Sequence, residues 1–207
     1  SPVLMSNVNV ETRVKVAGNL LRDYGFFNGS VTHEIIPQKD PKMEKITYVI
    51  DMGNPYYLDS IAWLKYPSKA DSLIQTTRRK SVLKKGDNFS VLKLEEERQR
   101  ISDLLRNNGY YYFRPDLTTF RADTLQKSGY VSLQVVPQNG LPAEAKKQYY
   151  IGKTSVYLTG YNGETPTDSL VFPSMTLHYH GKKPGIRPSA LTRNFFYRRG
   201  ELFSQDR

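Results

Sequence analysis

The residues that could carry out chemistry in this chain are few and far apart. The 207 residues include no cysteine, and the only histidines are His33, His178 and His180. Two residues apart on a strand, His178 and His180 would point to the same side and supply half of a metal site. No third ligand is evident nearby in the sequence, so we expect two surface histidines and no bound metal.

The acidic run Glu95 to Glu97 is the other group of side chains that could act together. It falls near the start of an expected amphipathic helix, where negative charge suits the helix dipole. We therefore expect a solvated helical turn rather than a pair of catalytic carboxylates. The sequence also contains no Gly-x-Ser-x-Gly nucleophile elbow and no glycine-rich phosphate loop. It predicts no catalytic residue, no cofactor and no enzymatic activity.

The net charge of +10 is concentrated in the last two thirds of the chain. Residues 1–53 are neutral overall, whereas residues 54–140 and 141–207 each carry a net charge of +5. A basic surface can attract nucleic acid, anionic lipid or acidic protein. Because most of the 15 tyrosines and 9 phenylalanines lie in strand-like runs, we expect them to support sheets and not to stack on nucleic acid.

Three short similarities repeat along the chain in the same order. The run Leu20 to Phe27 matches the run 104–111, with Gly25 in the position of Gly109. The other two similarities pair Tyr56-Tyr57-Leu58 with Tyr149-Tyr150-Ile151, and Gly86…Phe89-Ser90 with Gly200…Phe203-Ser204. Their shared order predicts successive copies of one structural unit.

Each copy of the glycine follows an expected amphipathic helix. We expect Asn9 to cap the first helix, and Gly25 and Gly109 to end the two helices in the left-handed conformation. The predicted apolar stripes are Ala17, Leu20, Leu21 and Tyr24 in the first helix, and Leu94, Ile101, Leu104 and Leu105 in the second.

Two strand signals follow each helix. The first pair is 31–37 and 46–50, and the second is 110–121 and 130–135. Pro115 falls inside the run 110–121, and a proline cannot donate a hydrogen bond to a sheet ladder. We therefore expect that strand at the edge of its sheet and the run 130–135 inside it.

The order of elements, together with residues 86–116, resembles the POTRA (polypeptide-transport-associated) domain of the BamA/TamA outer-membrane assembly superfamily. Family positions match Gly86, Phe89 and Ser90, and the link Gly53-x-Pro55-Tyr56. The resemblance implies an α+β fold of tandem β-α-α-β-β modules, each a three-stranded mixed sheet backed by two helices. We expect a partial module at 1–53, a complete module at 54–140, and a partial module at 141–207. The last carries an insertion near 160–187 with a strand-like run at 170–180.

The resemblance further implies a periplasmic location, with attachment to the outer membrane through a C-terminal β-barrel outside this sequence. The implied partners are unfolded outer-membrane proteins or other polypeptide cargo, and accessory periplasmic proteins or lipoproteins. An anionic membrane surface is a further partner that suits the basic charge, and nucleic acid is not expected. A secreted carbohydrate-binding or adhesin-like module is the alternative, although Trp63 is the only tryptophan.

Exposed edge strands offer the best physical basis for binding polypeptides. An unpaired edge presents backbone N–H and C=O groups that can pair with any extended chain, whatever its sequence. The candidate edges are the runs 29–37 and 111–121. Within them the predicted polypeptide-binding residues are Val31, His33, Ile35, Thr118, Thr119, Phe120 and Arg121.

Overall fold

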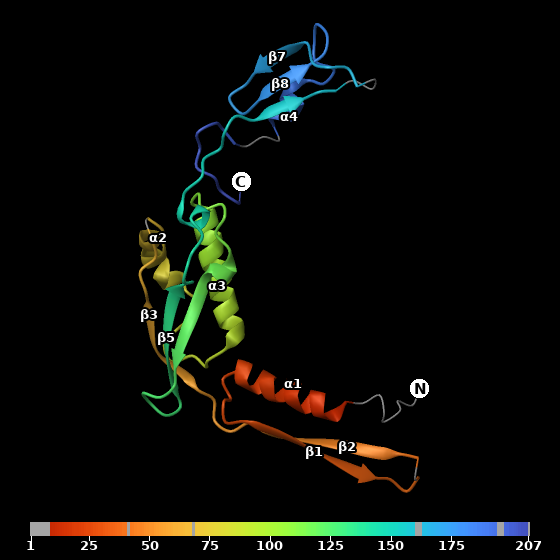
Figure 1. Cartoon of the computed structure of the whole chain (residues 1–207), viewed down its shortest axis with the longest axis vertical. Coiled ribbons are helices and arrows are strands. Elements are labelled where there is room, and N and C mark those ends of the chain that lie inside the picture. The colour runs from red at the N-terminus through yellow and green to blue at the C-terminus, as the bar shows by residue number, and fades with distance from the viewer. Residues whose placement is uncertain (1–8, 41, 68, 160–162, 194–196, 207) are drawn as a thin grey trace. The chain divides into compact units, whose positions relative to one another are not determined.

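The computed structural model describes residues 9–40, 42–67, 69–159, 163–193 and 197–206. The chain divides into two compact units, one formed by residues 1–66, 74–100 and 115–139 and the other by residues 67–73, 101–114 and 140–207. The described strands form three separate sheets (Figure 1). The mixed three-stranded sheets and their helices give the α+β fold that the sequence predicts.

The first module consists of α1 (Val10–Asp23) and the antiparallel strands β1 (Ser30–Pro37) and β2 (Glu44–Asp51). Asn9 caps α1 as predicted, because its side-chain oxygen accepts a hydrogen bond from the Thr12 N–H at 2.9 Å. The predicted apolar stripe is only half right. Leu20 and Tyr24 are 55% and 45% exposed. The more shielded positions are instead Val10, Val14, Ala17 and Leu21.

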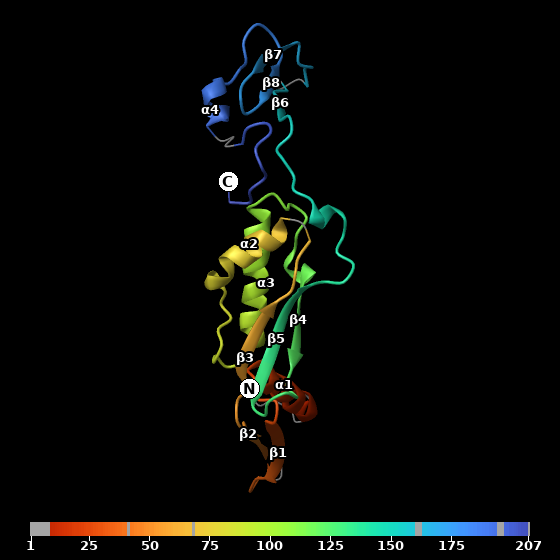
Figure 2. The same ribbon diagram turned by 90° about the vertical axis from the view of Figure 1, so that its left-hand side faces the viewer.

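The central module contains β3 (Tyr57–Trp63), α2 (Ala70–Thr77), α3 (Val91–Arg106), β4 (Thr118–Asp123) and β5 (Tyr130–Pro137). A short 3-10 helix, Arg78–Lys80, follows α2. Strand β5 lies between β3 and β4 (Figure 2), parallel to β3 and antiparallel to β4. The predicted three-stranded mixed sheet is therefore confirmed. Within the first unit, its fully buried core includes Leu58, Ile74, Leu117, Val131, Leu133 and Val135.

Strand β4 begins later than the sequence predicts. Pro115 does not lie in a strand, because residues Pro115–Leu117 form a 3-10 helix and β4 starts at Thr118. The fixed φ of proline suits such a turn, which also removes the ladder position that its missing N–H would have weakened. The predicted placement is nevertheless confirmed: β4 is an edge strand and β5 is the inner strand.

A buried tyrosine supports the inner side of β4. The Tyr66 hydroxyl donates a hydrogen bond of 3.0 Å to the Thr118 hydroxyl oxygen, and both side chains are buried. Burial raises the pKa of Tyr66 to about 12; the nearby Glu97 charge adds to the shift, and the Thr118 hydrogen bond partly opposes it. Loss of hydration on burial and the nearby negative charge of Glu97 both favour the neutral phenol in the folded chain.

Stability should therefore fall at alkaline pH. An unfolded tyrosine loses its proton near pH 10. Between about pH 10 and 12 the folded state binds more protons than the unfolded state, so the free energy of unfolding decreases as the pH rises. We expect a loss of about 2–3 kcal/mol across this window, measured by urea unfolding at successive pH values. Tyr66→Phe should show a smaller loss, although not none, because burial also raises the pKa of Tyr110. Equal losses in both proteins would contradict the assignment to Tyr66.

The third module contains β6 (Ser155–Tyr157), β7 (Asp168–Val171), β8 (Thr176–Tyr179) and α4 (Pro188–Thr192), preceded by a 3-10 helix, Glu144–Lys146. Strand β8 pairs in parallel with β6 and antiparallel with β7. The strand-like run at 170–180 is therefore not one strand but most of a hairpin with a turn at 172–175. Of the predicted insertion, residues 160–162 lie outside the described residues. Met175, Leu177 and Tyr179 form a small core with Val156, Leu158, Phe172 and Leu191.

Candidate functional site

The backbone amides of β4, an edge strand of the central sheet, alternately point toward β5 and away from it. The Gln138 N–H donates to the Leu117 carbonyl at 2.9 Å, which makes these residues a hydrogen-bonded pair of the antiparallel ladder. Alternation then turns the amides of Thr119 and Arg121 toward β5, and those of Thr118, Phe120 and Ala122 away from it. The outward amides are the groups that an added strand would meet.

Side chains under β4 hold this edge in place. Phe120 is half-buried, and the Arg98 guanidinium of α3 lies 5.3 Å from the centre of its ring. Thr118 is buried against Tyr66, whereas Arg121 and Ala122 are exposed. The edge of β4 therefore exposes backbone groups, while packed side chains beneath the strand hold it in position. Sequence patterns indicated residues 118–121 but missed Ala122, because the outward alternation appears only once the strand pairing is known.

The three residues predicted on β1 also lie on an outward backbone edge. The Gln38 N–H donates to the Met43 carbonyl at 3.2 Å, so alternation along the β1–β2 ladder turns Val31, His33 and Ile35 outward. His33 Nε2 lies 3.9 Å from the Glu11 carboxylate of α1. None of the hydrogen bonds or ion pairs described for β1 reaches β4, so the two predicted edges form separate sites.

Glu97 corrects the expectation of a solvated acidic turn. Glu95 and Glu96 are exposed, but the Glu97 side chain is fully buried. Its carboxylate accepts hydrogen bonds from the Val82 N–H at 3.0 Å and from Arg100 Nε and Nη2 at 3.0 and 2.5 Å. Arg100 in turn lies 5.9 Å from the centre of the Trp63 ring on β3. This network connects α3, the segment before it and the sheet, and it gives the buried carboxylate the partners it needs.

The first junction between modules is built around Gly25, Tyr56 and Phe89, all within the first unit. The Tyr56 N–H donates to the Gly25 carbonyl at 2.9 Å, and the Phe89 N–H donates to the Tyr56 carbonyl at 2.8 Å. Phe27 contacts both other aromatic side chains, with ring centres 5.0 Å from Tyr56 and 5.1 Å from Phe89. Gly25 has a φ of +85°, and a β-carbon there would lie 2.8 Å from the Phe89 carbonyl oxygen. This glycine ends α1 and also permits the close approach of the next module.

The second junction, within the second unit, repeats this arrangement. The Tyr149 N–H donates to the Gly109 carbonyl at 2.8 Å, and the Phe203 N–H donates to the Tyr149 carbonyl at 2.9 Å. Tyr111 takes the place of Phe27, with ring centres 6.5 Å from Tyr149 and 4.8 Å from Phe203. The three sequence similarities therefore occur at matching places in the structure. In both copies the glycine, tyrosine and phenylalanine form the same backbone hydrogen bonds.

The histidines do not form a metal site with other described residues. His178 of β8 stacks on the Tyr157 ring, with ring centres 4.5 Å apart and planes 10° apart. His180 Nδ1 lies 2.9 Å from the Thr165 carbonyl oxygen. In the described part of the chain, no three histidine, aspartate or glutamate side chains are placed to share a metal ion.

Comparison with known proteins agrees with this architecture. Residues 75–138 match the family model of POTRA, described as a surface antigen variable number repeat. These residues run from the last turn of α2 through α3 and β4 to the end of β5, and do not include β3. The class that the structure defines is an α+β fold with mixed three-stranded sheets. Within it, residues 75–138 are similar to POTRA domains.

Several solved structures resemble the chain at low sequence identity. BamA POTRA3-5 of Haemophilus influenzae has a TM-score of 0.49 and 11% identity, over 96% of this chain and 65% of that one. BamA of Haemophilus ducreyi lacking POTRA domains 1–3 has a TM-score of 0.39 and 16% identity, over 64% of this chain and 24% of that one. The N-terminal domain of Omp85 from Thermosynechococcus elongatus has a TM-score of 0.30 and 17% identity, over 96% of this chain and 68% of that one. The chain thus spans less than two thirds of the length of either BamA chain.

No curated protein matches the sequence. Among the described residues, no helix is both long enough and apolar enough to cross a bilayer.

Proposed function

We propose that this chain is a periplasmic scaffold and docking region of an outer-membrane protein assembly or translocation factor. Its modules bind extended polypeptides by adding a strand to exposed sheet edges. The partners are unfolded outer-membrane proteins or other polypeptide cargo, with accessory periplasmic proteins or lipoproteins at the remaining surfaces. The basic central and third modules would also favour an anionic membrane surface.

The observation that carries the proposal is the edge position of β4 in the central module. Its outward amides at Phe120 and Ala122 remain unpaired within the sheet, while Tyr66 and Arg98 support the strand from the inside. A rigid edge loses little conformational freedom when a client strand pairs with it, which favours binding. Backbone pairing is also insensitive to client sequence, which suits a receptor for many related clients.

The carbohydrate-binding alternative has less support from the arrangement of aromatic side chains. Trp63 is half-buried beneath Arg100 and contributes to the support of the sheet. The aromatic side chains at the two junctions pack on one another rather than lining a groove. These contacts favour a structural role for the aromatic residues.

Hydrogen exchange can test the β4 edge directly. In the free chain we expect the Thr119 and Arg121 amides to exchange slowly, because they pair with β5, and the Phe120 and Ala122 amides to exchange fast. An unfolded β-barrel client should slow Phe120 and Ala122 specifically. Ala122→Pro removes one outward donor without breaking the ladder, so it should weaken client binding about 3- to 10-fold.

Ala122→Val is the matched control, because it changes the same exposed position but keeps the N–H. It should bind client as the parent chain does and retain the slowed exchange. If saturating client leaves Phe120 and Ala122 exchange unchanged, β4 is not the docking edge. Equal affinities of the proline and valine variants would lead to the same conclusion.

A further inference from the structure

The segment between α2 and α3 contains the densest run of positive charge in the chain. It spans residues 78–86, which follow α2 in yellow in Figure 2, and it includes no acidic residue. Its five cationic side chains are all exposed: Arg78, Arg79, Lys80, Lys84 and Lys85. We call residues 78–86 the basic segment.

Four of these cations have no acidic partner in the described part of the chain. Lys85 lies 3.9 Å from the Asp59 carboxylate, but the other four appear in none of the described ion pairs. The next acidic residue, Asp87, already pairs with Lys93 at 2.6 Å. Like charges that lie close together repel each other, and an anion that binds among them relieves this repulsion.

The end of α2 accounts for only part of this charge. Cations near the C-terminus of a helix interact favourably with its dipole, which suits Arg78, directly after the last residue of α2, Thr77. The effect falls off within about one helical turn, so it does not explain Lys84. The basic segment therefore carries more positive charge than the fold requires.

Hydrogen bonds within the basic segment give it a defined conformation. The Ser81 N–H donates to the Arg78 carbonyl at 3.0 Å, and the buried Ser81 hydroxyl oxygen accepts from the Leu83 N–H at 3.1 Å. Lys84 Nζ donates to the Arg79 carbonyl at 3.1 Å, which connects the two groups of cations.

Further contacts attach the basic segment to the packed part of the central module. The Val82 N–H donates to the buried Glu97 carboxylate at 3.0 Å, and the Leu83 side chain is only 4% exposed. The Gly86 N–H donates to the Leu58 carbonyl of β3 at 2.7 Å. The backbone that carries the cations is therefore already ordered, so a ligand loses little of its binding energy to ordering it.

The side chains of the basic segment favour the carboxylates of a polypeptide over nucleic acid or lipid. None of residues 78–86 is aromatic, so no ring is available for a base to stack on. The two apolar side chains, Val82 and Leu83, are half-buried and buried, so neither is available to enter a bilayer beside the charges. The guanidinium groups of Arg78 and Arg79 match the two oxygens of a carboxylate.

We propose that the basic segment binds an acidic stretch of a partner polypeptide, whose carboxylates pair with Arg78, Arg79, Lys80 and Lys84. The partner stretch has several aspartates or glutamates close together, because the four cations lie within seven consecutive positions. This surface reads side-chain charge. It does not use a sheet edge, and it does not depend on strand addition at β4.

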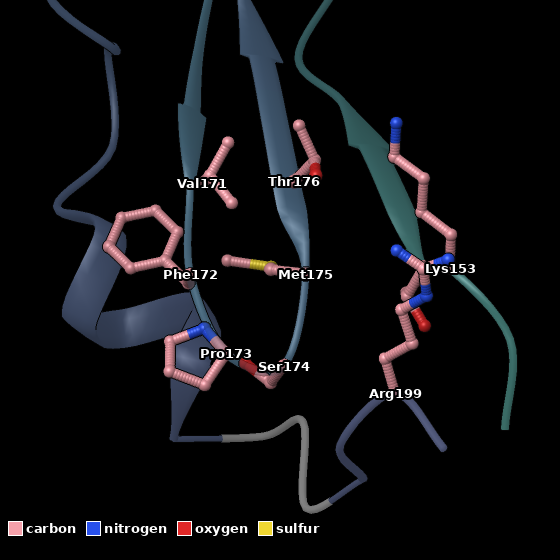
Figure 3. Close-up of a pocket in the computed structure, with 9 residues that line it drawn as sticks. Lys153, Val171, Phe172, Pro173, Ser174, Met175, Thr176 and Arg199 are labelled. Atoms are coloured by element: carbon pink, nitrogen blue, oxygen red, sulfur yellow. The ribbon is translucent and has the colours of Figure 1, made fainter.

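A pair of cations in the third module provides an internal comparison. Lys153 and Arg199 line a shallow hollow of about 290 Å³ (Figure 3). The same hollow is lined by Met175, which belongs to the core of that module. The hollow brings together two cations, whereas the basic segment has four without an acidic partner. The hollow should therefore contribute less to binding of a clustered acidic stretch.

The test uses the full 207-residue chain and a short peptide with four adjacent glutamates and a neutral label. Fluorescence anisotropy at low salt gives its affinity, together with that of a twin peptide with glutamines in place of the glutamates. The variant R78Q/R79Q/K80Q/K84Q should bind the acidic peptide at least about tenfold more weakly, because it loses charge-assisted hydrogen bonds. The glutamine twin should bind the parent chain and this variant equally. Added salt should weaken binding of the acidic peptide to the parent chain.

The matched control R13Q/K15Q/K39Q/K42Q removes two arginines and two lysines at exposed positions of the first module. This control and K153Q/R199Q should each bind the acidic peptide within about twofold of the parent chain. Circular dichroism should show that all variants are folded. If the matched control or K153Q/R199Q loses as much affinity as the basic-segment variant, binding follows overall charge or another site, and the proposal is wrong.

Vesicles of phosphatidylglycerol and phosphatidylcholine distinguish a membrane surface from a polypeptide. If the basic-segment variant loses binding to these vesicles while its affinity for the acidic peptide equals that of the parent chain, the result overturns the proposal in favour of lipid. Ala122→Pro should leave binding of the acidic peptide unchanged while it weakens client binding at β4. Failure of the basic segment and failure of the β4 edge can therefore be told apart.

Discussion

Replacing Glu97 with alanine should lower the free energy of unfolding by about 3–5 kcal/mol. The variant removes the carboxylate that accepts hydrogen bonds from Arg100 and from the Val82 N–H. Arg100, whose side chain is only 18% exposed, would keep its charge without its ion-pair partner. The cost is large because a buried group that loses its partner retains the full penalty of its lost hydration. Urea unfolding followed by circular dichroism measures the change.

Glu95→Ala is a closely matched control on the same helix. Glu95 also pairs with an arginine three residues later, Arg98, but its side chain is 54% exposed. Its loss should cost less than about 1 kcal/mol, because water screens and replaces a surface ion pair. Similar losses for the two alanine variants would show that Glu97 is not the buried anchor described above. The double variant Glu97→Leu with Arg100→Leu should recover much of the stability, since no unpaired charge remains.

Gly25→Ala should have the second largest effect, about 2–4 kcal/mol, and should act on the first junction. The substitution forces an L-residue into a left-handed conformation at φ +85°. Its β-carbon would also lie 2.8 Å from the Phe89 carbonyl oxygen, a backbone atom that can move only if the turn moves. We expect the Tyr56 and Phe89 amides to exchange faster with solvent, because their hydrogen bonds at the junction would be strained.

Gly129→Ala separates conformational strain from this steric effect. Gly129 has a similar φ of +76°, but a β-carbon there would meet nothing within 4 Å. This variant should therefore lose only about 1–2 kcal/mol and leave exchange at Tyr56 and Phe89 unchanged. If both alanine variants lose the same stability and exchange alike, close packing at Gly25 is not what the junction requires.

The repeated junction gives these predictions a functional meaning. The same glycine, tyrosine and phenylalanine backbone bonds occur at both junctions, with distances of 2.8–2.9 Å. Under the proposed function, a chain that docks polypeptides on several edges gains from junctions with a fixed local geometry, because linked sites then act at a high effective concentration. Loosening a junction should therefore weaken binding of long clients more than binding of short peptides.

The sequence by itself determined the features that depend on neighbouring residues. The cap at Asn9 and the left-handed stops at Gly25 and Gly109 follow from local backbone chemistry. The two strand pairs follow from alternation and composition, and the structure confirms both pairings, although the first strand of the second pair begins at Thr118 and not at residue 110. The order of the repeated similarities is matched by the repeated contacts at the two junctions. These signals are strong because each residue acts on backbone groups only a few positions away in the sequence.

Tertiary structure alone decided which side chains became buried and which backbone groups remained free. Glu97 looks like a solvated residue in the sequence, but the segment that carries the Val82 N–H folds against it, and Arg100 of the same helix pairs with it there. Leu20 is apolar yet exposed, since the described elements cover a different face of α1. The outward amide of Ala122 likewise depends on strand register. Long-range pairing decides which side chains are buried and which backbone groups remain free. Both properties depend on neighbours in space rather than on neighbours in sequence.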